Sequence, residues 1–141
     1  MCKKMSLKAI LLFSLCVLGF SSCKDNNEPD PAKPVINLTE IGRDNSKTVT
    51  AGNDLHLDAS IVAEGLIRQI DIEIRQEDGD FKIEIAYTEG KYIGVINADF
   101  HEHIDIPADA PAGEYHLHFI VTDQLGQTKM ESEELRVDNV N

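Results

Sequence analysis

Histidine is the residue type in this chain best suited to chemistry, and four of the five histidines form two His-x-His pairs. The pairs are His101/His103 and His116/His118, joined by a corner containing Pro and Gly within residues 100–123. On a β-strand, residues two apart point to the same face and lie about 6.6–7 Å apart. Two such imidazoles can converge on one Zn²⁺ or Cu²⁺ ion, which takes three or four ligands. Each pair is therefore a candidate part of a metal site.

The residues between the histidines predict which way their side chains point. Apolar and polar residues alternate here, which is typical of a strand with one face in a core. Leu117 and Phe119 are expected to point inward, so His116 and His118 point outward. On the preceding strand Ile104 is expected inward, which turns His101, His103 and Asp105 outward.

The same alternation recurs from residue 34 onward, with turn residues at intervals of about ten. Strands are predicted over residues 34–41, 55–61, 70–74, 81–87, 100–106, 115–122 and 128–137, with 47–50 continuing the first. One apolar and one polar face per strand is the pattern of antiparallel sheets that pack together over a core. The chain is therefore predicted to be all-β, with an immunoglobulin-like antiparallel β-sandwich of seven or eight strands over residues 34–141.

This fold predicts which histidines can meet. The strands that carry the two His-x-His pairs belong to opposite sheets, whose outer faces point apart, so a single four-histidine site is disfavoured. The strand with His56 and Asp58 usually pairs beside the strand with His101 and His103. These four outward side chains are expected to meet on one sheet and to form the candidate Zn²⁺ or Cu²⁺ site.

His116 and His118 form a second possible pair, facing the predicted strand that contains Asp71 and Glu73. An alternative applies to all of these histidines, because imidazolium groups on exposed strands also pair with carboxylates across a sheet. The sequence leaves both interpretations open. If metal binds, its affinity is expected to weaken as the pH falls through about 6.5, where free histidine titrates.

Residues 1–22 have the features of an export signal, with a basic start and an apolar run from residue 9 to residue 20. The run ends in Phe20-Ser21-Ser22-Cys23, which resembles the lipobox of bacterial lipoproteins. That resemblance implies lipidation of Cys23, which would become the mature N-terminus. The alternative is an ordinary secretory signal followed by an incidental cysteine.

Residues 23–33 are polar and contain Pro, without the apolar periodicity that a folded segment needs, so a flexible tether is predicted. Its acidic residues look like the export signal of some Gram-negative surface lipoproteins, although a plain spacer explains them equally well. The expected location is the outer membrane, with a lipid anchor and the domain facing the periplasm or the cell surface.

Composition narrows the class of partner and of chemistry. The chain carries 13 basic and 25 acidic residues, a net charge of −12, so nucleic acid and anionic lipid are poor partners. All three cysteines lie within the first 23 residues, which excludes disulfides and cysteine ligands from the predicted domain. No serine lies in a nucleophile-elbow context, and the adjacent carboxylates Glu133 and Glu134 lie in a solvated charge run. An enzyme is not predicted.

The stretch HEHIDIPADAPAGEYHLHF, residues 101–119, together with the lipobox and acidic tether, resembles the lipoprotein family named domain of unknown function 4625. The similarity covers most of residues 34–138. It implies an immunoglobulin-like lipoprotein and carries no activity with it. Its phrase Pro-Ala-Gly-Glu-Tyr is similar to the last hairpins of bacterial immunoglobulin-like modules, in which Tyr115 would be the corner tyrosine with its hydroxyl bonded to nearby backbone.

These observations lead to two hypotheses about function. The first is a membrane-anchored, non-catalytic binding module that contacts a protein, a glycan or an envelope complex. The second is an extracytoplasmic metal-binding protein that uses its His-x-His pairs for Zn²⁺ or Cu²⁺. An exposed aromatic cluster would favour glycan binding, whereas close packing of His56, His101 and His103 would favour metal.

Overall fold

The computed structural model describes residues 29–141, which form eight β-strands and one short 3-10 turn. The elements are β1 (Val35–Ile41), η1 (Arg43–Asn45), β2 (Thr48–Thr50), β3 (Asp54–Val62), β4 (Ile67–Gln76), β5 (Lys82–Tyr87), β6 (Asn97–Asp105), β7 (Gly113–Asp123) and β8 (Thr128–Asp138). The predicted signal segment 1–22, Cys23 and the start of the tether lie outside the described residues. Within residues 29–141, no helix is long and apolar enough to cross a membrane.

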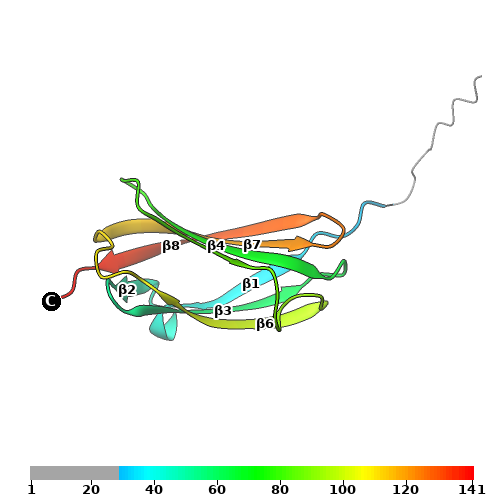
Figure 1. Ribbon diagram of the computed structural model, residues 1–141, viewed down its shortest axis with the longest axis horizontal. Coiled ribbons are helices and arrows are strands. Elements are labelled where there is room, and N and C mark those ends of the chain that lie inside the picture. Colours follow the sequence, from blue (N-terminus) through cyan, green and yellow to red (C-terminus); the bar gives the residue numbers. More distant parts are fainter. Residues whose placement is uncertain (1–28) are drawn as a thin grey trace, which may run out of the picture.

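The strands form two sheets that pack face to face (Figure 1). One sheet has the order β1-β3-β6 and the other the order β2-β8-β7-β4-β5. This arrangement corresponds to immunoglobulin strands A, B and E facing strands G, F, C and C′. The predicted all-β sandwich is confirmed. The two His-x-His pairs lie on β6 and β7, in opposite sheets as expected.

The start of the fold differs from the prediction in one respect. Residues 47–50 were expected to continue the first strand, but β2 belongs to the other sheet and pairs in parallel with β8. The chain changes sheet through Gly42, Asp44, Asn45 and Lys47, all of which have positive φ angles. Left-handed residues reverse the chain direction sharply, and Gly, Asp and Asn tolerate that conformation best. All other strand pairings in the described part of the chain are antiparallel.

A single apolar core fills the space between the sheets. Phe100 on β6 and Phe119 on β7 meet across it, with ring centroids 5.0 Å apart in an edge-to-face arrangement. The alternation predicted from the sequence holds on both strands, because Leu117 and Ile104 are buried while their histidine neighbours are not. The core therefore fixes the outward direction of every histidine considered above.

Tyr115 forms the predicted corner. Its side chain is 1% exposed, and its hydroxyl donates a hydrogen bond of 2.6 Å to the carbonyl oxygen of Pro111. Burial raises the pKa of the Tyr115 hydroxyl, so this group keeps its proton and stays a donor. The corner fixes the start of β7 relative to the loop that leaves β6.

Candidate metal centre

The candidate centre lies on the outer face of the three-stranded sheet, where β3 and β6 are paired. His56 on β3 is directly opposite His103 on β6, and Asp58 is directly opposite His101. The register confirms that these four side chains share one face of one sheet. Because the partners are directly opposite, their Cβ atoms are within the range of direct side-chain interaction.

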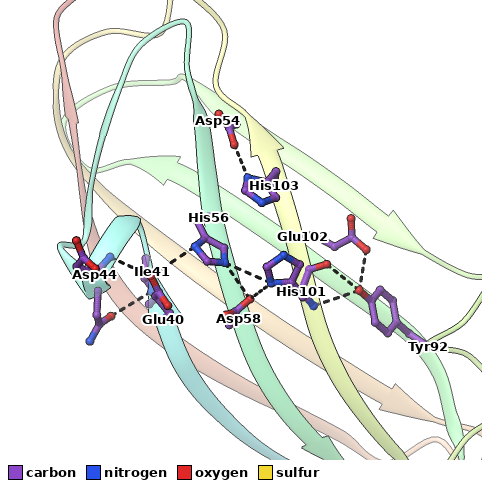
Figure 2. A network of polar contacts seen from close by, with 11 residues as sticks. Glu40, Ile41, Asp44, Asp54, His56, Asp58, Tyr92, His101, Glu102 and His103 are labelled. Atoms are coloured by element: carbon purple, nitrogen blue, oxygen red, sulfur yellow. Dashed lines mark hydrogen bonds and ion pairs between the residues drawn. The ribbon is translucent and has the colours of Figure 1, made fainter.

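Each of the three imidazoles has a carboxylate beside its Nδ1 atom (Figure 2). His101 Nδ1 lies 2.6 Å from Asp58 Oδ1, and His103 Nδ1 forms a short hydrogen bond with Asp54. His56 Nδ1 makes a looser contact of 3.4 Å with Glu40 Oε1. Metal-ligating histidines usually donate one ring N–H to a carboxylate, which fixes the ring and leaves the other nitrogen free for the metal. This arrangement leaves the Nε2 atoms of His101 and His103 as candidate ligands, whereas His56 Nε2 already lies 3.3 Å from His101 Nδ1 and 3.2 Å from Asp58 Oδ1.

The three rings lie close enough to share one ion. The ring centroid of His56 is 4.9 Å from that of His101 and 5.0 Å from that of His103. One ligand nitrogen from each ring lies within 4.8 Å of the other two. A tetrahedral Zn²⁺ ion with bonds of 2.0–2.1 Å holds its nitrogens about 3.3 Å apart. The three rings must therefore move closer together for all of them to bind one ion.

Asp58, predicted to join the histidines, contacts two of the three rings but is not part of the three-histidine group. Its Oδ1 atom lies 2.6 Å from His101 Nδ1 and 3.2 Å from His56 Nε2. His56 thus lies between two carboxylates, with Glu40 on its other side. A doubly protonated His56 would donate to both, so an ion-pair network without metal satisfies the same contacts. Glu40, His56 and Asp58 also form a second group capable of holding an ion.

The centre is open to solvent and has an acidic surrounding. The side chains of His101 and His103 are 58% and 54% exposed, whereas that of His56 is 25% exposed. The hydrogen bond from His103 is the main reason that the pKa of Asp54 is lowered, so this carboxylate is ionised at neutral pH. A surface groove of about 710 Å³ borders His56 and His103. An ion can therefore reach the centre from solution, attracted by the surrounding negative charge.

Sequence reasoning missed two members of this network, Asp54 and Glu40. Asp54 could have been found, because it continues the outward alternation of His56 and Asp58 on the same strand. Glu40 gave no local signal. It lies opposite Asp58 only because β1 pairs with β3 around an irregularity between Leu38 and Glu40.

The second histidine pair lacks a comparable arrangement. On β7, His118 lies opposite Glu73 and its Nδ1 atom is 2.7 Å from Ser132 Oγ, whereas His116 lies opposite Arg75. The two rings have centroids 6.4 Å apart. The pair faces β4 as predicted. Among residues 29–141, no group of three potential ligands within metal-binding distance includes either histidine.

Tyr92, in the connection between β5 and β6, closes the free edge of β6 beside His101. Its hydroxyl lies 3.1 Å from the His101 backbone nitrogen, 3.0 Å from its carbonyl oxygen and 2.7 Å from Glu102 Oε1 (Figure 2). It accepts from the backbone N–H and donates to one of the oxygens. Tyr92 is 4% exposed, and its ring packs against Phe100. The side chain thus holds the backbone that carries one candidate ligand.

Replacing Tyr92 with Phe is expected to lower the free energy of unfolding by about 1–3 kcal/mol, because a buried hydrogen-bond network loses its centre. Urea unfolding measures this change, and hydrogen exchange should show faster exchange of the His101 amide. Tyr87→Phe is the matched control, since the Tyr87 hydroxyl makes no side-chain hydrogen bond in the described part of the chain. An equal loss in both variants would contradict a specific role for the Tyr92 hydroxyl.

Comparison with known proteins identifies the family of the chain. The family model described as Domain of unknown function (DUF4625) matches residues 21–138. No curated protein matches the chain significantly. The match covers the whole sandwich, including both His-x-His pairs and every member of the candidate metal centre. This chain is therefore a member of the DUF4625 family.

Proposed function

We propose that this protein is a lipid-anchored, non-catalytic binding module of the outer membrane whose ligand is a Zn²⁺ or Cu²⁺ ion. His56, His101 and His103 supply the ligands, and Asp58 orients the His101 ring by accepting a hydrogen bond from its Nδ1 atom. The single observation that carries the proposal is the pairing of each imidazole with its own carboxylate, in a cluster whose ligand atoms lie within 4.8 Å. Imidazole nitrogens suit both of these ions.

The alternative is a module that binds a protein or glycan instead of metal. Glycan recognition usually involves exposed aromatic rings, and the exposed large hydrophobic residues between 29 and 141 are all aliphatic. A protein ligand or envelope-complex partner remains compatible with the sandwich. The histidine cluster favours metal binding. Six side chains have a specific arrangement there, which metal binding explains and a generic interaction surface does not require.

The direct test is titration of Zn²⁺ and Cu²⁺ into the purified chain from Lys33 onward, with elemental analysis of the protein as isolated. One ion per chain is expected to bind, with release of protons from the imidazoles on binding. The metal-free protein should have the same fold as the loaded protein. Absence of saturable binding for both ions would leave the cluster as an ion-pair network and would remove metal from the function.

Anchorage is tested separately by Cys23→Ala. The lipobox resemblance supports lipidation of this cysteine, so the variant is expected to leave membranes and to accumulate as the uncleaved precursor. Membrane fractionation and intact mass spectrometry measure both effects. A Cys23→Ala chain that is shortened and still fractionates with membranes would contradict lipid anchorage at this position. Metal binding by the purified domain would be unaffected by that result.

A further inference from the structure

Exposed apolar side chains gather at one end of the sandwich. Six large hydrophobic residues are exposed in the described part of the chain, and four of them lie where β1 begins. These four, hereafter the apolar end, are Val35, Val62, Ile96 and Leu125, with exposures of 62%, 44%, 45% and 62%. Scattered single exposed hydrophobics are normal on protein surfaces, whereas a group at one place indicates a contact surface.

Pairing and packing place these four residues at the same end of the sandwich. Val35 on β1 lies directly opposite Val62 on β3. The next amide, that of Ala63, donates a 2.7 Å hydrogen bond to the carbonyl of Ile96, which brings Ile96 beside Val62. Leu125 lies in the turn between β7 and β8. It packs so closely on Gly65 that a Cβ atom there would lie 3.0 Å from Leu125 Cγ.

We propose that the apolar end rests on the surface of the lipid bilayer that holds the Cys23 anchor. This inference depends on the lipid anchorage proposed above, and it adds the orientation of the domain. Residues 24–34 separate Cys23 from Val35, and even a fully extended segment of that length reaches only about 40 Å. The first strand, β1, begins at the apolar end, which is the end opposite the C-terminus (Figure 1), so a tether of this length joins the domain there.

Apolar contact, and not charge, must stabilise this arrangement. The chain has a net charge of −12, which opposes approach to an anionic membrane. Aliphatic side chains partition into the interface between headgroups and acyl chains, and a tether that keeps the domain near the surface raises their effective concentration. The apolar end should therefore engage zwitterionic lipid more strongly than anionic lipid, and added salt should reduce that difference.

The orientation has a consequence for the candidate metal centre. Val62 lies six positions after His56 along β3, a distance of about 20 Å at the rise of a strand. The crossover that contains η1 lies at the opposite end of the sandwich from the apolar end (Figure 1). With the apolar end on the lipid, the histidine cluster and its groove face the aqueous phase and stay accessible to ions.

The test couples the chain from Cys23 to Asn141 through its single cysteine to a maleimide lipid in phosphatidylcholine vesicles, and compares hydrogen exchange with that of the free chain. Chemical coupling places the domain at a bilayer whether or not Cys23 is lipidated in cells, so failure of natural anchorage and failure of this inference are distinguishable. Exchange in segments 63–66 and 124–127 is expected to slow on vesicles by on the order of threefold or more, while segment 42–47 is unchanged.

Val62→Glu/Leu125→Glu is expected to abolish this protection. Ala108→Glu/Val140→Glu is the matched control, because both residues are exposed and both lie beside Gly52, away from the apolar end. The control should retain the protection. Equal exchange on vesicles and in solution overturns the inference, as does loss of protection in both variants. A third outcome also overturns the inference. If protection appears only when the chain forms a concentration-dependent dimer, and disappears in Val62→Glu/Leu125→Glu, the apolar end binds a second copy of the chain and not lipid.

Discussion

Replacing both His101 and His103 with alanine is expected to reduce the affinity of the domain for Zn²⁺ and Cu²⁺ by about 100-fold or more. The variant removes two of three nitrogen ligands and leaves His56 with carboxylates that bind these ions less well. Isothermal titration measures the loss. Both side chains are more than half exposed and point away from the core, so the fold is expected to survive the change.

Two further variants make this prediction specific. Asp54→Asn keeps every ligand but weakens the acceptor that orients His103, and loss of such an orienting partner typically costs 10–100-fold in metal affinity. His116→Ala/His118→Ala is the matched control, since it removes an outward His-x-His pair from the other sheet. That control should bind metal with unchanged affinity.

Acidification should weaken metal binding in the wild-type domain. An imidazole nitrogen ligates only when it carries no proton, and free histidine gains its second proton as the pH falls through about 6.5. Affinity is therefore expected to be highest at neutral or mildly basic pH and to fall toward pH 5. Titrations at several pH values measure this, and an affinity that rises on acidification would contradict ligation by histidine.

The pattern of outcomes separates the candidate explanations. Equal metal affinity in the wild type and in His101→Ala/His103→Ala would show that the cluster is an ordinary network of surface ion pairs. Loss of affinity in the His116/His118 variant instead would move the site to the five-stranded sheet. Only a loss confined to the β3–β6 face, with an intermediate effect of Asp54→Asn, supports the proposed centre.

The sequence predicted the orientation of the histidines because alternation is a local property. Leu117 and Phe119 are apolar, so the period of two along a strand sets His116 and His118 on the opposite face without any knowledge of the rest of the fold. The meeting of His56 with His103 needed one further step, the strand order of an immunoglobulin-like sandwich. That step also succeeded.

What the sequence could not supply were contacts set by irregular backbone. Glu40 reaches His56 because β1 carries an irregularity after Leu38, and the alternation pattern does not register such a shift. β2 belongs to the other sheet because four residues within the range 42–47 adopt positive φ angles. Three of these four residues are not glycine. Tyr92 lies in a connection without periodicity, so its contact with the edge of β6 was equally invisible.

The stability of the apolar core should not depend on bound metal, and truncating core side chains should therefore destabilise the domain strongly whether or not metal is present. Leu117→Ala and Phe119→Ala are each expected to lower the free energy of unfolding by about 2–5 kcal/mol, because both side chains are fully buried and truncation leaves a cavity. Urea unfolding measures the change. Ile120→Ala, on the same strand but facing outward, is the matched control and should cost less than about 1 kcal/mol.

Chelator should leave the domain folded and shift its melting midpoint little, because the candidate ligands lie on the outer face while the core lies between the sheets. Bound metal adds stability only through mass action, about 2.7 kcal/mol at a free concentration 100 times the Kd. The losses caused by Leu117→Ala and by chelation of the loaded protein should therefore add independently. A chain that unfolds in chelator alone would contradict this and would make His56, His101 and His103 structural ligands, on which the pairing of β3 with β6 depends.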